Sequence, residues 1–203
     1  MLKKVSGFIV LAALAVSICF AARAYADIPK TETIVLAGGC FWGVEAVFEH
    51  TKGVVDAKSG YAGGTAETAN YKHVSAGKSS HAEVVQVTYD PQQITLDKLL
   101  DVYFTVAHNP TQLNYQGPDH GTQYRSAVFY SSPEQQKIVT QKIATLTSPA
   151  PIVTRLEPLE KFYVAENYHQ NYAAENPYQP YIVMHDAPKV ANLQKTFPEL
   201  YVK

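Results

Sequence analysis

The sequence predicts an α+β fold, a mixed sheet with helices packed on it, and three observations support this. Four short runs rich in β-branched and aromatic side chains are typical of strands: residues 31–37, 54–61, 81–89 and 126–130. Residues 94–107 carry apolar side chains at helical spacing, and residues 131–134 (SSPE) are a helix-start signal. The third observation is the order of these segments, β-α-β-β-α-β followed by α-β.

Each element follows from the local sequence. The strand at 31–37 (TETIVLA) ends in Gly38-Gly39, and the segment CFWGVEAVFEH then has three apolar residues at helical spacing: Val44, Val47 and Phe48. Strands at 54–61 (VVDAKSGY) and 81–89 (HAEVVQVTY) follow, and Pro91 breaks the chain after the second. The helix at 94–107 has one apolar face, made of Leu96, Leu99, Leu100, Tyr103 and Phe104. The strand SAVFY, the helix containing QQKIVTQKIATL and a last strand at 152–159 complete the pattern.

The first six elements match the split βαβ, or ferredoxin-like, arrangement. After residue 160 the chain is rich in Tyr and Asn and contains Pro177, Pro180 and Pro188, so we expect an irregular C-terminal wrap over this core. Two segments, 62–80 and 108–125, are too long for simple connections. Functional sites tend to be built from structured loops of this length.

The N-terminal residues have the features of a secretory signal peptide at 1–26. Lys3 and Lys4 precede an apolar stretch at 7–22, and a small-x-small site, Ala24-Tyr25-Ala26, follows it. The apolar stretch is shorter than the roughly 20 residues that span a bilayer and is interrupted by Arg23; the alternative is an uncleaved anchor. We therefore expect an exported, periplasmic protein with a single domain at 27–203 and no stable membrane insertion after cleavage.

Charge and cysteine content narrow the classes of function. Removing residues 1–26 takes three of the 17 basic residues and none of the 18 acidic ones, which leaves a net charge of −4 and does not favour nucleic acid as a partner. Cys19 leaves with the signal peptide, so Cys40 is then the only cysteine and cannot form an internal disulfide. Its thiol is buried and inert, paired between two chains, or reactive.

The predicted position of Cys40 favours a reactive thiol. It lies in the first turn of a helix that follows a strand, where unpaired backbone N–H groups and the helix dipole favour the thiolate. Gly38 and Gly39 allow a sharp turn and the close approach of a ligand to the sulfur. Phe41 and Trp42 would form an apolar floor for a small apolar group; the alternative is that both are ordinary core residues.

Glu83 is a candidate acid. Alternation in HAEVVQVTY places it on the same face of the strand as Val85 and Val87. A carboxyl on an apolar face has its charged form disfavoured, so it stays protonated near neutral pH and can donate a proton. The alternative is a glutamate at the strand end that points into water, since both faces of this strand carry valine.

Four motifs, kept in order along the chain, resemble those of the A type of peptide methionine sulfoxide reductase. They are GCFWGVE at 39–45, SGYAGG at 59–64, HAEVVQVTYDP at 81–91 and GPDHGTQYRS at 117–126. The similarity extends from about residue 33 to about residue 175. It implies that residues 27–203 form a catalytic domain that reduces the S epimer of methionine sulfoxide, free or protein-bound, and so repairs proteins after oxidative stress.

The resemblance also implies roles for individual residues. Cys40 would be the thiol nucleophile, which attacks the sulfoxide sulfur while acids protonate the oxygen, giving methionine and a sulfenic acid. The other catalytic residues would be Glu83 as the acid, Tyr71 and Tyr124 as hydrogen-bond donors to the sulfoxide oxygen, and Asp119. Phe41 and Trp42 would hold the terminal methyl group of the substrate. No metal, nucleotide or flavin cofactor is implied.

The sequence departs from its relatives near the C-terminus. Many relatives carry one or two resolving cysteines there, close to a segment that NYHQNYAAENP at 167–177 resembles, and no cysteine follows Cys40 here. The sulfenic acid would then be reduced by an external thiol through a mixed disulfide. We expect a thioredoxin-like or glutaredoxin-like protein as the reductant, with dithiothreitol as its substitute in vitro.

Three alternative interpretations are open from the sequence. Glu166 and His169 have the E-x-x-H spacing of helical metal sites, but no second copy completes a di-metal site. A thiol hydrolase would need a histidine to activate Cys40, and the candidates are His81, His108, His120 and His169. A non-enzymatic binding domain with an aromatic pocket for methionine-like side chains would make Cys40 incidental.

Overall fold

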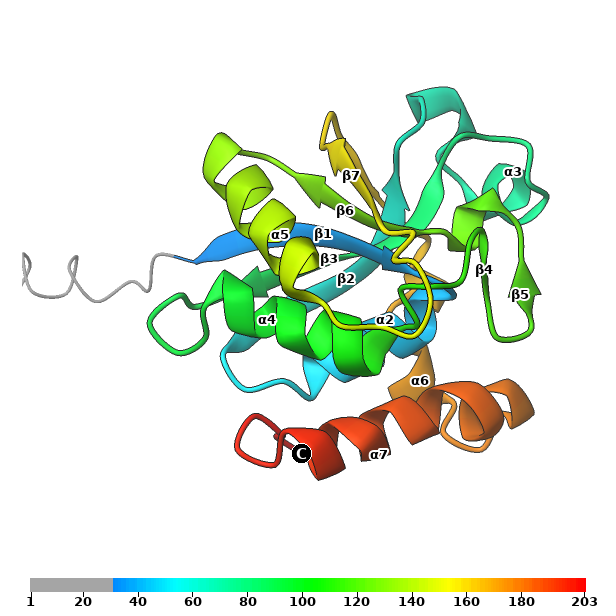
Figure 1. Ribbon diagram of the computed structural model, residues 1–203. Coiled ribbons are helices and arrows are strands. Elements are labelled where there is room, and N and C mark those ends of the chain that lie inside the picture. Colours follow the sequence, from blue (N-terminus) through cyan, green and yellow to red (C-terminus); the bar gives the residue numbers. More distant parts are fainter. Residues whose placement is uncertain (1–30) are drawn as a thin grey trace, which may run out of the picture. The chain divides into compact units, whose positions relative to one another are not determined.

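A six-stranded sheet is the central element of the computed structural model, which describes residues 31–203 (Figure 1). Its strand order is β7-β6-β1-β3-β2-β8. The strands are β1 (Glu32–Gly38), β2 (Val54–Ala62), β3 (Ala82–Tyr89), β6 (Ser126–Tyr130), β7 (Arg155–Pro158) and β8 (Phe162–Val164). The signal peptide predicted at 1–26 lies outside the described residues.

The four inner strands form the ferredoxin-like core that the sequence predicts. β3 pairs antiparallel with both β1 and β2, so β1 and β2 run in the same direction with β3 between them. Helix α2 (Phe41–Glu49) connects these two strands, and β6 pairs antiparallel with the other edge of β1. β7 and β8 extend this core by one strand at each edge, β7 parallel to β6 and β8 antiparallel to β2. The predicted split βαβ arrangement is therefore confirmed.

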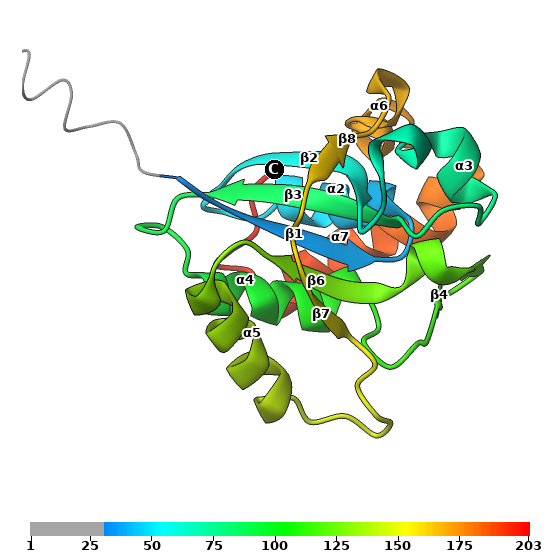
Figure 2. The ribbon, with the colours of Figure 1, turned by 90° about the horizontal axis from the view of Figure 1, so that it is seen from above.

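The main helices lie on one face of the sheet, and seen from above in Figure 2 the strands lie in front of α2 and α7 (Ala187–Thr196). The main core is formed between this face and α2, α4 (Leu96–Val102) and α5 (Pro133–Thr145), with Val85 on the sheet and Phe48, Leu99 and Val139 on the helices. The opposite face carries a smaller cluster that includes Val84 and is covered by Leu159 and Phe162. Neighbouring residues of β3 therefore enter different clusters, as strand alternation requires.

Two helices begin with the capping contacts that their sequences indicate. The side chain of Thr95 accepts a hydrogen bond from the N–H of Lys98 at the start of α4, and Ser132 accepts one from Gln135 at the start of α5. α4 continues into a π-helical turn at Tyr103–Ala107, so the helix predicted at 94–107 is present but changes its winding. The last predicted strand is shorter than expected, at 155–158.

The C-terminal segment is more regular than the irregular wrap we expected. It contains α6 (Tyr172–Glu175), a π-helical turn at Ile182–Asp186 and α7 (Ala187–Thr196), which packs on α2. Pro188 lies in the first turn of α7, where its missing N–H costs no hydrogen bond, so this proline starts a helix and does not break one. Within residues 31–203, none of the helices has the length and apolar character needed to cross a membrane.

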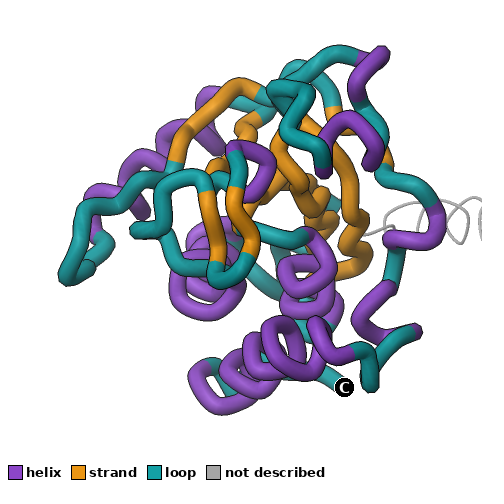
Figure 3. Tube along the Cα trace, turned by 90° about the vertical axis from the view of Figure 1, so that its right-hand side faces the viewer, coloured by secondary structure: helices purple, strands orange, loops and turns teal. Residues whose placement is uncertain are grey.

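Both long loops carry structure of their own. The segment 62–80 contains α3 (Tyr71–Ser75), and 108–125 contains a two-stranded ribbon of β4 (Tyr115–Gln116) and β5 (Asp119–His120). α3 and this ribbon lie on the right in Figure 1, at the end of β1 where α2 begins. Figure 3 looks onto this end of the molecule, with the loops in teal in front of the strands. The fold therefore brings both loops to the start of α2.

Candidate active site

Cys40 occupies the turn between β1 and α2. It is the N-cap residue of α2, and the preceding Gly39 has a φ of +93°, a conformation that favours glycine. A Cβ atom at Gly39 would lie 2.6 Å from Cβ of Gln116, and one at Gly38 would lie 2.9 Å from Cβ of His108. The predicted turn is confirmed, but protein side chains, and not space for a ligand, account for the two glycines.

Burial determines the ionisation of Cys40 in the free protein. The residue is 8% exposed, and burial raises the pKa of its thiol well above its usual value, with further increases from the nearby Glu83 and Asp186. The backbone N–H of Trp42 and the charge of Lys189 lower the pKa but do not outweigh these effects. The helix start therefore lowers the pKa of the thiol, as expected, but desolvation of the sulfur is the larger effect and keeps the thiol protonated in the free site.

Glu83 lies beside Cys40 as a buried acid. It is 2% exposed and shares the helix-covered face of β3 with Val85 and Val87, as the alternation predicts. Burial raises its pKa to about 8, opposed by a hydrogen bond of 3.2 Å from the N–H of Phe41 to Oε2 and assisted by the charge of Asp119. Glu83 is therefore protonated at neutral pH and has a proton to donate.

Three tyrosine side chains lie near the thiol of Cys40 and the carboxyl of Glu83. Tyr71 is the first residue of α3, Tyr124 ends a 3₁₀ turn at Thr122–Tyr124, and Tyr181 precedes the π-helical turn of the C-terminal segment. Burial raises the pKa of each, and the charge of Cys40 contributes in all three cases. The Tyr181 hydroxyl donates a hydrogen bond to the carboxylate of Asp119. All three phenols are only half-buried, so they lie where a substrate can reach them.

Phe41 and Trp42 form an aromatic surface next to the thiol. Phe41 is buried and belongs to the main core, whereas Trp42 packs on the edge of that core. The indole of Trp42 stacks on Tyr172 with ring centroids 3.9 Å apart, and its N–H donates to Nδ1 of His169 over 3.2 Å. The rings of Tyr181 and Trp42 are nearly perpendicular, with their centroids 6.0 Å apart. These contacts fix the orientation of Trp42.

A model of the family "peptide methionine sulfoxide reductase" matches residues 32–200. The chain belongs to this family. It is 55% identical over 177 residues to the peptide methionine sulfoxide reductase MsrA 2 of Mesorhizobium japonicum, covering 85% of this chain and 91% of that protein. It is 46% identical over 173 residues to MsrA of Pasteurella multocida, covering 84% and 99%.

Solved structures of this family are similar to the fold described above. Methionine sulfoxide reductase A of Corynebacterium diphtheriae has a TM-score of 0.67 at 39% identity, covering 76% of this chain and 80% of that one. Reduced Mxr1 of Saccharomyces cerevisiae has a TM-score of 0.65 at 40% identity, covering 75% and 90%. The protein is thus a peptide-methionine (S)-S-oxide reductase, which reduces methionine sulfoxide and repairs oxidised proteins. The thiol hydrolase and binding-domain interpretations are set aside.

Glu166 and His169 of this reductase have roles that the E-x-x-H spacing did not indicate. The carboxylate of Glu166 accepts hydrogen bonds from the Tyr61 hydroxyl at 2.8 Å and from the N–H of Tyr71 at 2.9 Å. Nδ1 of His169 accepts a hydrogen bond from the indole N–H of Trp42. Each therefore orients a neighbour of Cys40. Within residues 31–203, no group of three or more His, Cys, Asp or Glu side chains is arranged to hold a metal ion.

The C-terminal segment supplies the site residues of the reductase that sequence reasoning missed. Tyr181 contacts Trp42 and Asp119, and Asp186 and Lys189 change the pKa of Cys40. The expected irregular wrap gave no reason to place these side chains near the thiol. The available signal was Asp186-Ala187-Pro188, an acidic residue two positions before a proline, which is a pattern for the start of a helix.

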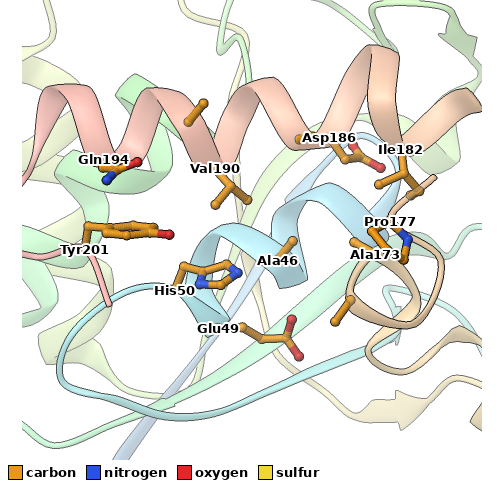
Figure 4. A pocket seen from close by; sticks show the side chains of 13 residues that line it. Ala46, Glu49, His50, Ala173, Pro177, Ile182, Asp186, Val190, Gln194 and Tyr201 are labelled. Carbon is orange, nitrogen blue, oxygen red and sulfur yellow. The ribbon is translucent and has the colours of Figure 1, made fainter. Parts of the chain in front are cut away.

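A separate pocket of about 390 Å³ lies between α2 and α7 of the reductase (Figure 4). Alanine and other apolar side chains make up most of its wall, including Ala46, Ala173 and Val190. None of the catalytic or substrate-binding residues predicted from the sequence lines it. Asp186 is the one lining residue whose charge also acts on Cys40.

Proposed function

We propose that Cys40 is the nucleophile of this reductase and that Glu83 protonates the sulfoxide oxygen. The observation that supports this is the placement of a buried thiol, at the start of α2, beside a carboxyl whose pKa is raised to about 8. Near neutral pH the carboxyl carries the proton that the developing negative charge on oxygen requires. Tyr71 and Tyr124 face the same groups and donate hydrogen bonds to that oxygen.

In this mechanism the sulfoxide oxygen moves to Cys40. Sγ attacks the electrophilic sulfur and forms an S–S bond as Glu83 gives its proton to the oxygen. The hydroxyl then moves to Sγ, so that the S–S bond and the S–O bond of the former sulfoxide break as a new S–O bond forms on Sγ. Methionine leaves as the thioether and Cys40 becomes a sulfenic acid. The proton of the Cys40 thiol restores the carboxyl of Glu83, so one thiol and one sulfoxide are converted and no atom is lost.

Phe41 and Trp42 hold the methyl group of the substrate in this mechanism. The aromatic surface is apolar and rigid, because Trp42 is fixed by Tyr172 and His169. A methyl group gains free energy on leaving water for such a surface, about 0.8 kcal/mol per carbon buried. A fixed place for the methyl group and the phenol donors for the oxygen together select one epimer at sulfur, which for this enzyme is the S epimer.

An external thiol completes the cycle. No cysteine follows Cys40 in the sequence, so we propose that the sulfenic acid reacts with a thiol to give a mixed disulfide and water, and that a second thiol releases Cys40. A thioredoxin-like or glutaredoxin-like protein is the proposed donor. Oxidised enzyme should bind one thiol equivalent in an intact-mass measurement; a disulfide within the monomer would contradict this.

We also propose that the protein is exported and periplasmic, with residues 1–26 removed. The proposal is supported by the basic, apolar and small-residue pattern of the N-terminal sequence. It requires a reductant in the same compartment. Fractionation of cells followed by N-terminal mass analysis should find a protein that starts at Asp27, whereas full-length protein in the cytoplasmic fraction would contradict export.

The assay that tests the catalytic roles uses separated S and R epimers of methionine sulfoxide with excess dithiothreitol. We expect turnover of the S epimer only, abolished in Cys40→Ser and slowed in Glu83→Gln. Glu160→Gln, at an exposed position outside the site, is the matched control and should retain full activity. Retained turnover in Cys40→Ser would refute the assignment of the nucleophile.

A further inference from the structure

An ion pair from the C-terminal segment lies next to the helix that positions Cys40. Asp186 is completely buried, and its Oδ1 accepts a hydrogen bond of 3.1 Å from Nζ of Lys189. The Lys189 side chain is 23% exposed, so its ammonium group reaches inward from the surface. The second carboxylate oxygen, Oδ2, is buried without any hydrogen-bond partner. A buried carboxylate with one free oxygen costs folding free energy, which calls for a functional explanation.

The pair contacts the first turn of α2 at Gly43. A Cβ atom at this position would clash with Oδ1 of Asp186 and lie 2.6 Å from Nζ of Lys189, so only glycine permits the contact. Gly43 is the third residue of the helix whose N-cap is Cys40. Figure 4 shows Asp186 at the start of α7, above α2. The two opposite charges therefore lie against the third residue of the helix that begins at Cys40.

Several charged groups change the pKa of Cys40. Among those in residues 31–203, Lys189 is the cation. Glu83, from β3, and Asp186 both raise the pKa of the thiol, and Lys189 lowers it. Asp119 and the phenols of Tyr71, Tyr124 and Tyr181 face the same space and are electrostatically coupled to it. His108, which lies against Gly38, is neutral because burial lowers its pKa to about 3.

We propose that Lys189, held in place by Asp186, is a positioning residue that stabilises negative charge on Sγ of Cys40 during catalysis. The inference rests on the proposed role of Cys40 as the nucleophile. Attack on the sulfoxide requires the sulfur to lose its proton in a buried site, where a thiolate without a cation is disfavoured. The ammonium group supplies that cation, and the carboxylate fixes where it lies.

The carboxylate also explains why the charge is supplied as a pair. A lysine alone at this place would lower the pKa of the buried thiol further and make the resting sulfur more reactive toward oxidants before substrate binds. Asp186 offsets part of the lysine charge and adds to the effect of burial, which keeps the resting sulfur protonated.

The test is the pH dependence of Cys40 alkylation by iodoacetamide, followed by peptide mass analysis so that the label on Cys40 is measured directly. Because the cation is partly exposed, we expect Lys189→Met to raise the apparent pKa of Cys40 and to slow alkylation about tenfold at pH 8. Asp186→Asn should lower the apparent pKa of Cys40 and speed its alkylation. Lys189→Arg should restore the wild-type profile, and Lys195→Met, exposed on the same helix, is the matched control.

If the apparent pKa of Cys40 shifts in opposite directions in Lys189→Met and Asp186→Asn, the cause is the charge of the pair and not damage to the structure. Misfolding would expose Cys40 in both variants and shift its pKa in the same direction. Unchanged profiles in Lys189→Met and Asp186→Asn, or shifts in the same direction, would overturn the proposal. The measurement needs no turnover. If Cys40→Ser retained sulfoxide reduction, the proposed function would fail while the alkylation result would still report on the ion pair.

Discussion

Replacing Glu83 by Gln removes the proton that the mechanism requires and changes little else. The amide has the same shape and keeps an oxygen that can accept the hydrogen bond from Phe41, which is 3.2 Å long in the wild type. Loss of a general acid lowers the rate of the chemical step by about 10²- to 10⁴-fold. In the wild type, the rate should also fall as pH rises through about 8, where Glu83 loses its proton. This alkaline decrease should be absent from the residual activity of Glu83→Gln.

The same substitution has a consequence for stability that can be worked from the raised pKa. The pKa of Glu83 rises from 4.5 to about 8 on folding, so the folded protein holds this proton more tightly than the unfolded chain. Its contribution to stability is full below pH 4.5 and is lost as pH rises toward 8 and beyond. At 1.36 kcal/mol per unit, the loss amounts to about 5 kcal/mol as an upper bound. Gln at this position has no such pH dependence.

Urea unfolding of both proteins at pH 5 and pH 9 measures this difference. Glu45, whose pKa burial also raises to about 8, is present in both and cancels in the comparison. We expect the wild type to lose several kcal/mol more than Glu83→Gln between the two pH values. Glu160→Gln should behave as the wild type. A wild-type loss equal to that of Glu83→Gln would refute the conclusion that Glu83 is a protonated, buried acid.

Three further substitutions test the surroundings of the thiol. Gly39→Ala forces a side chain into a φ of +93° against Gln116, so urea unfolding should show that the free energy of unfolding falls by about 2–4 kcal/mol. The control Gly117→Ala, also at positive φ but with open space around it, should lower this free energy by about 1 kcal/mol. Equal losses in the two variants would contradict the predicted clash. Tyr181→Phe removes the hydroxyl that donates a hydrogen bond to Asp119, and kcat/KM should fall about tenfold. Tyr178 is exposed, and the control Tyr178→Phe should leave kcat/KM unchanged. Glu166→Ala leaves the hydroxyl of Tyr61 and the N–H of Tyr71 without an acceptor, so the free energy of unfolding should fall by about 2–4 kcal/mol. The control Glu160→Ala should leave it unchanged.

The parts of the fold that depend on local pattern could be predicted from the sequence. Strand alternation placed Glu83 on the same face as Val85 and Val87, which the structure shows to be covered by helices. The glycine pair followed by apolar residues at helical spacing located Cys40 at the start of α2. Both features depend on a few neighbouring residues. The order of strands and helices then limited the core to the split βαβ arrangement.

The parts that depend on tertiary packing could not be predicted in this way. Burial of the Cys40 sulfur, which raises its pKa, results from residues far away in the sequence that pack over the start of α2. The prolines after residue 160 indicated irregular chain, although Pro188 starts a helix. Tyr181 and Lys189 reach the site only because α7 packs on α2, and no short motif records that contact.

The central claim is that the sulfoxide oxygen is transferred to Cys40, and a single-turnover experiment tests it most directly. The protein, freed of reductant, is mixed with the S epimer of methionine sulfoxide, and methionine and the modification of Cys40 are measured together with a sulfenic acid reagent. The account predicts one methionine per protein and one sulfenic acid, located on Cys40, with neither formed from the R epimer. Methionine formed without a modified Cys40, or formed equally by Cys40→Ser, would contradict it.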